Sequence, residues 1–477
     1  MLYTRSLNEK RLIYKIIIFI YIYMNSITPT LLKQFRNEYK KDYIHSLLEN
    51  GISENTIESL FLERDIIQKY NYIFSNKIAV SQNITNQFNT GRCWLFSFTN
   101  ILRNDLIKEY NLPENFTLSN THLFFYDKLE KCNYFIDNVL NTLEKEFDSE
   151  LIKYLIKDPI TDGGNWHMAI NLINKYGILP ESNMRESYQS ANSKYLNYFL
   201  KDNLLIYMNK IRKMYKKDGR KILKKQNIVK LKSNILSHIY KILCYFLGKP
   251  ISKFDWTYYD NKKNYKLIKN LTPKKFYKNI MNFNPDEYVI CVNYPIKEYP
   301  YNKIYNIKYC NNMINGQNTE MINLPIEKII KYCKRSVDNN EGIWFGSDVG
   351  KYSHKWKGIL DTDIYNFDDL YNSDMLTKEE ALLYKQSEPS HAMVIIGYDK
   401  DKNNKITKWL VENSWGEQGD KDNKGYLRMS NNWFKKYVYS IVVKKDTLDP
   451  KILKIFKNTA NYIEVEPWGY MGCAALK

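Results

Sequence analysis

The chain has 477 residues, of which 71 are Lys or Arg and 52 are Asp or Glu, so its formal net charge is +19. Hydrophobic residues make up 44% of the chain and aromatic residues 15%, which is enough apolar material for a packed core and excludes an intrinsically disordered protein. Gly (18) and Pro (13) are sparse, which excludes collagen-like and linker-dominated chains. The length predicts roughly two to four domains, or one domain with large insertions.

Neither the charge nor the cysteines indicate a function by themselves. A basic chain is typical of proteins that bind nucleic acids or anionic membranes, but an AT-rich genome also explains an excess of Lys, Asn, Ile and Tyr. No two cysteines form a C-x-x-C pair, which argues against a zinc ribbon. Their odd number and irregular spacing favour reduced thiols in a cytosol-like compartment. The cysteines are at positions 93, 132, 244, 291, 310, 333 and 473.

The amino terminus carries basic residues followed by an apolar run at residues 16–24. This run is shorter than the roughly 20 residues that span a bilayer. It resembles the apolar part of a signal peptide, but Asn25, Ser26 and Ile27 provide no small-residue cleavage site after it. We expect that translation begins at Met24, with a signal or membrane anchor as the alternative.

Apolar periodicity predicts helices through the first half of the chain. Residues 30–75 read as short amphipathic helices, and leucine and phenylalanine recur at helical spacing from residue 93 to 110. Residues 165–176 form another predicted helix, because Gly177 suits the position after its end and Pro180 lies just beyond.

The following region, residues 190–250, reads as helical and strongly basic. Its segment 201–232 contains twelve Lys or Arg residues against two Asp. After about residue 340 the pattern changes to short strands rich in aromatic or β-branched residues, separated by polar turns. Strands are predicted at residues 391–398, 408–413, 425–429 and 437–443. Helices followed by strands indicate an α+β fold.

A candidate nucleophile lies at the start of the helix predicted from residue 93. A cysteine at a helix N-terminus experiences the positive end of the helix dipole, which favours the thiolate, the form that attacks a carbonyl group. Gln87 lies six residues before Cys93, so its amide can stabilise an oxyanion together with the backbone N–H of Cys93. Taken alone, this motif is equally typical of a small buried residue at a helix start.

A second motif, far along the chain, supports the catalytic interpretation. His391 begins an apolar strand, and Asn413 follows 22 positions later, with Trp415 close behind. An Asn side-chain oxygen can hold a His ring in the tautomer that faces a thiol without adding charge, and Trp415 can shield that hydrogen bond from water. A lone His or Trp at such positions would be structural, but the order Gln–Cys–His–Asn is specific.

This order resembles the papain-like cysteine peptidases. The run Thr90-Gly91-Arg92-Cys93-Trp94-Leu95-Phe96 is similar to the bleomycin hydrolase/aminopeptidase C family, because no cysteine stands three residues before Cys93. Secreted papain-type enzymes have a disulfide partner there. The resemblance continues at residues 162–166, 174–177, 344–351, 424–427 and 433–434.

The resemblance implies a two-lobed fold, with a helical lobe and a β-barrel-like lobe. It implies that Cys93 is the nucleophile and His391 the general base and acid. Asn413 would orient His391, with Trp415 supporting, and Gln87 would form the oxyanion hole. The family also implies that the pair Gly163-Gly164 aligns an extended substrate, since only glycine allows such close approach, although a simple turn is the other interpretation.

The distance between the two motifs predicts an insertion. Papain-type enzymes place the His roughly 130–150 residues after the Cys, whereas here 391 − 93 gives 298. The excess falls mainly in a helical, Lys-rich insertion at residues 181–340. The family implies cytosolic homohexamers with such an insertion.

The final segment resembles the family's C-terminal arm, whose terminal carboxylate meets the substrate's α-amino group and makes the enzyme an aminopeptidase. Here that carboxylate would belong to Lys477, but five residues follow Met471-Gly472 where the family has about four. The predicted organisation is a leader or mis-assigned start, an N-terminal helical hook, a helical lobe, the insertion, a β-rich lobe and the arm. Their bounds are 1–24, 25–75, 76–180, 181–340, 341–450 and 451–477.

We therefore expect an intracellular, cytoplasmic thiol aminopeptidase that acts on peptides through an acyl-enzyme on Cys93. The alternatives are an endopeptidase-like thiol protease, or a basic nucleic-acid-binding protein on the same scaffold that uses residues 201–232. No metal or organic cofactor is predicted. No membrane association is predicted unless residues 16–24 form an anchor.

Overall fold

The computed structural model describes residues 26–80, 83–371, 375–417, 419, 424–457 and 462–474. These residues form two compact units. One contains the described residues up to Leu62 with Tyr365–Phe367, and the other contains Glu63–Ile364 and the described residues from Asp368 onward. The predicted leader at residues 1–24 and the predicted terminal residue Lys477 lie outside the described residues.

The first unit consists of short helices, as predicted. They are α2 (Pro29–Tyr39), α3 (Tyr43–Glu54) and α4 (Ile57–Leu60). The side chain of Thr28 accepts a hydrogen bond from the N–H of Leu31, and Asp42 accepts one from Ile44, which satisfies backbone donors at the helix starts. Neither α2 nor α3 buries a side chain.

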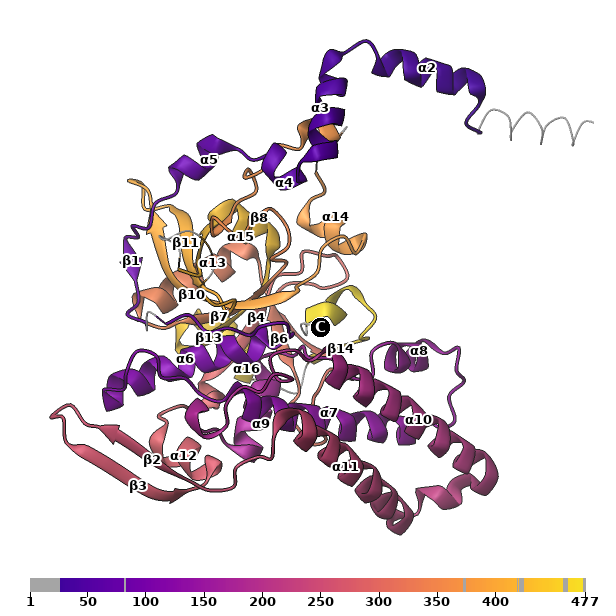
Figure 1. Ribbon diagram of the computed structural model, residues 1–477, viewed down its shortest axis with the longest axis vertical. Helices are drawn as coiled ribbons and strands as arrows, with labels where there is room; N and C mark the ends of the chain where they lie inside the picture. Colours follow the sequence, from indigo (N-terminus) through magenta and orange to yellow (C-terminus); the bar gives the residue numbers. More distant parts are fainter. Residues whose placement is uncertain are drawn as a thin grey trace, which may run out of the picture. The chain divides into compact units, whose positions relative to one another are not determined.

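The helical part of the second unit surrounds a core of aromatic and aliphatic side chains that includes Trp94, Phe98 and Trp166. Its helices are α6 (Cys93–Tyr110), α7 (Asn120–Asn141), α8 (Glu150–Lys157) and α9 (Trp166–Tyr176), whereas α5 (Arg64–Lys69) buries no side chain and lies on the side of the strands (Figure 1). The helices predicted at residues 93–110 and 165–176 are confirmed as α6 and α9. Gly177 ends α9 with a φ of +72°, and a Cβ there would lie 2.2 Å from the backbone carbonyl carbon of Pro273.

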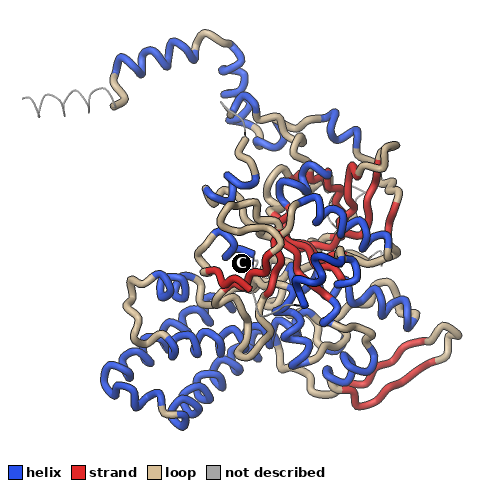
Figure 2. Tube along the Cα trace, turned by 180° about the vertical axis from the view of Figure 1, so that it is seen from behind, coloured by secondary structure: helices blue, strands red, loops and turns tan. Residues whose placement is uncertain are grey.

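The segment at residues 181–340 is only partly helical. Helices α10 (Lys194–Asp218) and α11 (Lys225–Leu247) lie side by side as a long hairpin (Figures 1 and 2). A separate two-stranded ribbon follows, made of β2 (Phe254–Tyr259) and β3 (Tyr265–Leu271). The rest contains α12 (Pro273–Ile280), α13 (Ile326–Asp338) and three strands of the main sheet. The prediction of a wholly helical segment up to residue 340 is therefore wrong where β2 to β6 occur, between Leu247 and α13.

The main sheet has twelve strands among the described residues, in the order β14-β5-β6-β4-β13-β7-β10-β11-β12-β9-β8, with β1 paired to β10. The strands predicted after residue 390 are confirmed as β10 to β13, and the α+β fold class is confirmed with them. The bounds are β1 (Asn76–Lys77), β4 (Tyr288–Val292), β5 (Lys303–Ile307), β6 (Glu320–Asn323), β7 (Ile343–Ser347), β8 (Ser353–His354), β9 (Ile359–Leu360), β10 (His391–Lys400), β11 (Ile406–Glu412), β12 (Tyr426–Ser430), β13 (Val438–Lys444) and β14 (Tyr462–Val465).

A second core lies against this sheet, and Phe345, Trp409 and Phe434 are among its buried members. Helices α14 (Lys378–Leu383), α15 (Asn431–Tyr437) and α16 (Pro450–Lys457) accompany the strands, with short 3₁₀ turns at Glu181–Asn183, Gly219–Leu223, Pro285–Glu287, Asp368–Leu370, Lys445–Thr447 and Tyr470–Ala474. Within the described part of the chain, no helix combines the length and apolar character needed to cross a bilayer.

Candidate active site

Cys93 is the first residue of α6, and its side chain is buried, with 3% exposed. The preceding residue, Arg92, makes no side-chain cap, so the N–H groups of the first turn stay available to the thiol. Burial raises the pKa of Cys93 to about 11, while hydrogen bonds from the backbone of Ala392, Trp94 and Cys93 itself favour the thiolate. The amides at the helix start thus act in the expected direction, but the effect of burial is larger.

The contact with Ala392 brings the thiol beside His391, the first residue of β10. The Nε2 atom of His391 lies 2.8 Å from the Oδ1 atom of Asn413. The backbone N–H of Ser414 also donates to this Oδ1, at 2.8 Å, so the oxygen is an acceptor and Nε2 carries the proton. This leaves Nδ1 of His391 free to act as the base.

The environment of His391 favours the uncharged ring. Burial lowers its pKa to about 4, the hydrogen bond with Asn413 opposes this effect, and the charge of Lys355 adds to it. The ring of Trp415 stacks on the His391 ring with centroids 4.8 Å apart. Trp415 therefore covers one face of the imidazole that is bonded to Asn413.

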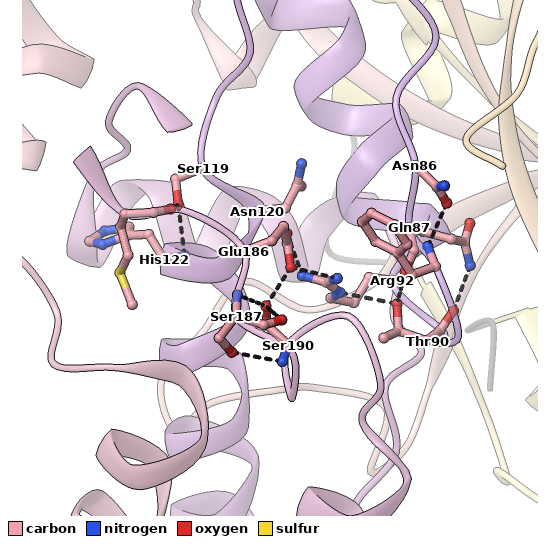
Figure 3. A network of polar contacts seen from close by, with 12 residues as sticks. Asn86, Gln87, Thr90, Arg92, Ser119, Asn120, His122, Glu186, Ser187 and Ser190 are labelled. Carbon is pink, nitrogen blue, oxygen red and sulfur yellow. Dashed lines mark hydrogen bonds and ion pairs between the residues drawn. The ribbon is translucent and has the colours of Figure 1, made fainter. Parts of the chain in front are cut away.

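Gln87 is tied to the same segment. Its backbone N–H donates to the carbonyl of Ser414 at 2.8 Å, and the hydroxyl of Ser414 donates to its Oε1 at 2.8 Å. Its Nε2 donates to the carbonyl of Thr90 at 2.6 Å (Figure 3). Because Oε1 is held by a donor and Nε2 by an acceptor, the direction of the Gln87 amide is determined, and it lies in the loop that leads into Cys93.

The glycine pair lies against the other side of the α6 start. The indole Nε1 of Trp94 donates to the carbonyl of Asp162 at 2.8 Å, and the ammonium of Lys131 donates to the carbonyl of Gly163 at 2.5 Å. Among the described residues, neither backbone polar group of Gly164 has a hydrogen-bond partner. Gly164 therefore offers a free N–H and a free C=O, which an extended peptide can pair with. The predicted pair Gly163-Gly164 is thus brought next to Cys93 through Trp94.

A cavity of about 140 Å³ adjoins this glycine pair. Its wall includes Lys131, Tyr134, Tyr309 and Gly472, which belongs to the last described segment of the chain. The carboxyl-terminal segment therefore reaches the cavity that the glycine pair lines. Lys477 itself lies outside the described residues.

A buried ion network lies beneath the glycine pair. The ammonium of Lys128 is 2.7 Å from the carboxylate of Asp162, which also accepts hydrogen bonds from the backbone of Gly91 at 3.0 Å and from the side chain of Asn197 at 2.8 Å. Burial would raise the pKa of Asp162, but Lys128 and these donors hold it well below its usual range. Asp162 thus links the glycine segment, the loop before Cys93 and the start of α10.

The motifs missed several supporting residues. Asp162 and Arg92 stand directly before predicted site residues, so their places in the motifs were a usable signal. Ser414 also follows Asn413 directly. Lys131 has no signal in the sequence, because its role depends on a contact 32 positions away. Within the described residues, no group of three His, Cys, Asp or Glu side chains is arranged to hold a metal ion.

The buried cysteine at a helix start, the histidine that heads a strand and the asparagine that orients it define a papain-like thiol hydrolase on a helical and a β-rich lobe. A family model described as the Peptidase C1-like family matches residues 26–472, and the chain belongs to this family. The resemblance and the two-lobed fold predicted from the sequence are confirmed.

Individual relatives agree with this family. Aminopeptidase C of Listeria innocua is 33% identical over 443 residues, which is 93% of this chain and 94% of the relative. Bleomycin hydrolase of Homo sapiens is 32% identical over 438 residues, which is 90% of this chain and 94% of the relative. The crystal structure of PepW from Lactobacillus rhamnosis HN001 matches with a TM-score of 0.89 and 36% identity, covering 94% of this chain and 99% of that chain.

Proposed function

We propose that this cysteine peptidase is a thiol aminopeptidase, which removes N-terminal residues from peptides through an acyl-enzyme on Cys93. The observation that carries the proposal is the 2.8 Å contact between His391 Nε2 and Asn413 Oδ1, beside a thiol that opens a helix. This contact leaves Nδ1 of His391 as the base for the thiol proton.

The chemistry follows from these positions. His391 Nδ1 takes the proton of Cys93 while the sulfur attacks the scissile carbonyl carbon, and the carbonyl oxygen becomes an oxyanion. The side-chain amide of Gln87 and the backbone N–H of Cys93 stabilise that oxyanion. The protonated His391 then gives its proton to the leaving amine as the C–N bond breaks, and water, deprotonated by His391, hydrolyses the thioester.

Transfer of the proton from the Cys93 thiol to the His391 ring is a step that the site must assist. Burial raises the pKa of Cys93 and lowers that of His391, so neither group ionises alone near neutral pH. Transfer creates a thiolate and an imidazolium together, and each stabilises the other. The amides around the sulfur and the side chain of Asn413 favour the two charged products.

Removal of the thiol tests the nucleophile. Cys93→Ala should abolish turnover and labelling by a thiol-directed peptide epoxide, because no other group can form the acyl-enzyme. Cys333→Ala is the matched control, since it removes a buried thiol from the core of the sheet lobe. Retained turnover in the Cys93 variant would rule the assignment out.

Removal of residues from the N-terminus of a peptide, rather than cleavage within it, is supported by separate observations. The relatives are named as aminopeptidases, and the segment at Gly472 lines the cavity that also contains Gly163 and Gly164. A terminal carboxylate there would favour a substrate ammonium and block a longer peptide. Peptides with free and acetylated N-termini should therefore differ strongly in kcat/KM, and equal rates would remove the aminopeptidase assignment while leaving the peptidase one.

We also propose a homohexamer in the cytoplasm. Helices α2 and α3 bury no side chain, and their apolar residues Leu32, Phe35 and Leu47 are 41%, 48% and 58% exposed. Such faces are typical of surfaces that pack against another chain. Light scattering after size exclusion measures the assembly, and a monomer would contradict the proposal.

Binding of nucleic acid stays a separate hypothesis. Many lysines of the α10–α11 hairpin are exposed, including Lys210, Lys213 and Lys217, which supports contact with phosphates but is also typical of a solvated helix face. Affinity that does not fall steeply with salt would exclude phosphate contacts.

A further inference from the structure

The residue before the nucleophile carries a fully buried charge. The Arg92 side chain has no exposed surface, and its two terminal nitrogens lie 2.9 and 3.0 Å from the two carboxylate oxygens of Glu186 (Figure 3). The rings of Phe96 and Phe124 lie 5.2 and 5.1 Å from the guanidinium carbon. A two-point ion pair combined with contacts to aromatic rings leaves a guanidinium one orientation.

The fixed guanidinium of Arg92 is connected to the loop of Gln87 by hydrogen bonds through Thr90. Its Nε donates to the hydroxyl of Thr90 at 3.0 Å, and that hydroxyl donates to the carbonyl of Gln87 at 2.6 Å. The Nε2 of Gln87 in turn donates to the carbonyl of Thr90 at 2.6 Å. Because a hydroxyl has one hydrogen, the donor from Arg92 directs the Thr90 hydrogen to Gln87. The Thr90 hydroxyl thus holds the backbone carbonyl of Gln87, while the Thr90 carbonyl and the Ser414 hydroxyl hold the two ends of the Gln87 amide.

Glu186 is itself held in place at the entrance to the inserted helices. The hydroxyl of Ser190 donates to its carboxylate, the N–H of Ser187 donates to that hydroxyl at 2.7 Å, and the N–H of Ser190 donates to the Ser187 hydroxyl at 2.9 Å (Figure 3). The backbone N–H of Asn89 donates to the carbonyl of Ala191 at 3.0 Å. The turn at residues 186–191 therefore contacts the nucleophile loop through both a side chain and the backbone.

We propose that Glu186 is a positioning residue for the peptidase reaction, which acts through Arg92 and Thr90 to aim the amide of Gln87 at the oxyanion. The inference rests on the proposed function, in which Gln87 is an oxyanion donor. It makes the inserted segment part of the machinery of the active site. A merely structural ion pair would affect folding and all reactions of Cys93 alike, whereas this role affects only steps that form an oxyanion.

The experiment compares two reactions of the same thiol in the full-length protein. Peptide hydrolysis forms an oxyanion, whereas alkylation of Cys93 by iodoacetamide forms none. Glu186→Gln should lower kcat roughly 10- to 100-fold, with KM and the alkylation rate changed by no more than about twofold. Thr90→Val removes the connecting hydroxyl without changing charge, and should show the same signature even if the Glu186 variant folds poorly.

The control breaks a more exposed ion pair, between α7 and the inserted helix α11. Asp137→Asn removes the partner of Lys232, 3.1 Å away, which joins α7 to α11, and should leave turnover and alkylation unchanged. Equal losses of turnover and alkylation in Thr90→Val, or wild-type turnover in both Glu186→Gln and Thr90→Val, would overturn the inference.

A double-mutant cycle that combines Glu186→Gln with Gln87→Ala tests whether Glu186 acts through Gln87. If Glu186 acts through Gln87, Glu186→Gln should lower kcat little further once Gln87 is removed, so the two losses do not add. Full additivity would overturn the route. A Gln87→Ala variant with wild-type turnover would instead refute the oxyanion assignment of the proposed function. A large loss in that variant without one in Glu186→Gln or Thr90→Val would refute only the positioning role.

Discussion

Gly164 has no room for a side chain, and Gly164→Ala tests whether its close approach to α6 matters. A Cβ at this position would lie 2.6 Å from the Cε2 atom of Trp94 and 2.7 Å from its Cζ2 atom. Ordinary contact begins at 3.4 Å, so the glycine segment or the indole must move by about 0.8 Å. Trp94 is fully buried and bonded to the carbonyl of Asp162 at 2.8 Å, so we expect the glycine segment to move.

The displacement of the glycine segment should change both the stability of the protein and its kcat/KM. Overpacking of this kind costs about 1–3 kcal/mol in the free energy of unfolding. A displacement approaching 1 Å in a group that aligns substrate lowers kcat/KM by up to about 100-fold. Urea unfolding measures the first effect, and hydrolysis of a peptide with a free N-terminus measures the second.

Gly350→Ala is the matched control for this prediction. The nearest atom to a Cβ at Gly350 is the Oδ1 of Asp348, 3.9 Å away, so stability should change by no more than about 0.5 kcal/mol and activity should not change. A Gly164→Ala protein with the stability and kcat/KM of the wild type would refute the reasoning. It would show that the segment does not need its present distance from Trp94 to align a substrate.

Three further predictions concern Asn413, the buried ion pair of Glu412 with Arg103, and the buried histidines His122 and His391. Asn413→Ala should lower kcat by up to the roughly 100- to 10,000-fold that a positioned acid–base group supplies, and steady-state kinetics would contradict this if kcat were unchanged. Glu412→Gln leaves the buried guanidinium of Arg103, now 2.8 Å from the carboxylate, without its charge partner, and should cost about 3–5 kcal/mol in a urea titration; a neutral result would refute the pairing. Burial lowers the pKa of both His122 and His391 from 6.5 to about 4. Between these values the unfolded chain binds protons that the folded chain does not. Stability should therefore be full above pH 6.5 and fall toward pH 4 by up to about 3 kcal/mol per histidine. His122→Asn should reduce the pH dependence of the free energy of unfolding between pH 4 and 6.5. An unchanged pH dependence would contradict the assignment of this effect to His122.

The spacing of apolar residues predicts those helices and strands whose formation depends on the local sequence. Helix α6 and strands β10 to β13 are predictable because their apolar side chains recur at helical or strand spacing. Strands β4, β5 and β6 were missed because the region was interpreted from its length and its lysines. Their place in the sheet depends on distant pairing, since Val292 of β4 lies opposite Ser440 of β13. No local pattern encodes a partner almost 150 residues away.

At the active site, too, some residues can be recognised from local sequence and others only from the fold. Gln87, Cys93, His391 and Asn413 are recognisable because each lies in a short motif whose residue types suit one chemistry. Glu186 has no such motif, and only the fold brings it to Arg92. Short motifs therefore identify the groups proposed to react, but not those that hold them.

The environment of the thiol illustrates why the supporting groups matter. Burial raises the pKa of Cys132, Cys310 and Cys93 alike. The backbone amides of Ala392, Trp94 and Cys93 itself oppose this effect at Cys93, but burial remains the largest influence there. A proton acceptor must therefore complete the activation, and His391 is next to the thiol through Ala392. The reactivity of Cys93 thus depends on joining the start of α6 to the start of β10, rather than on the helix alone.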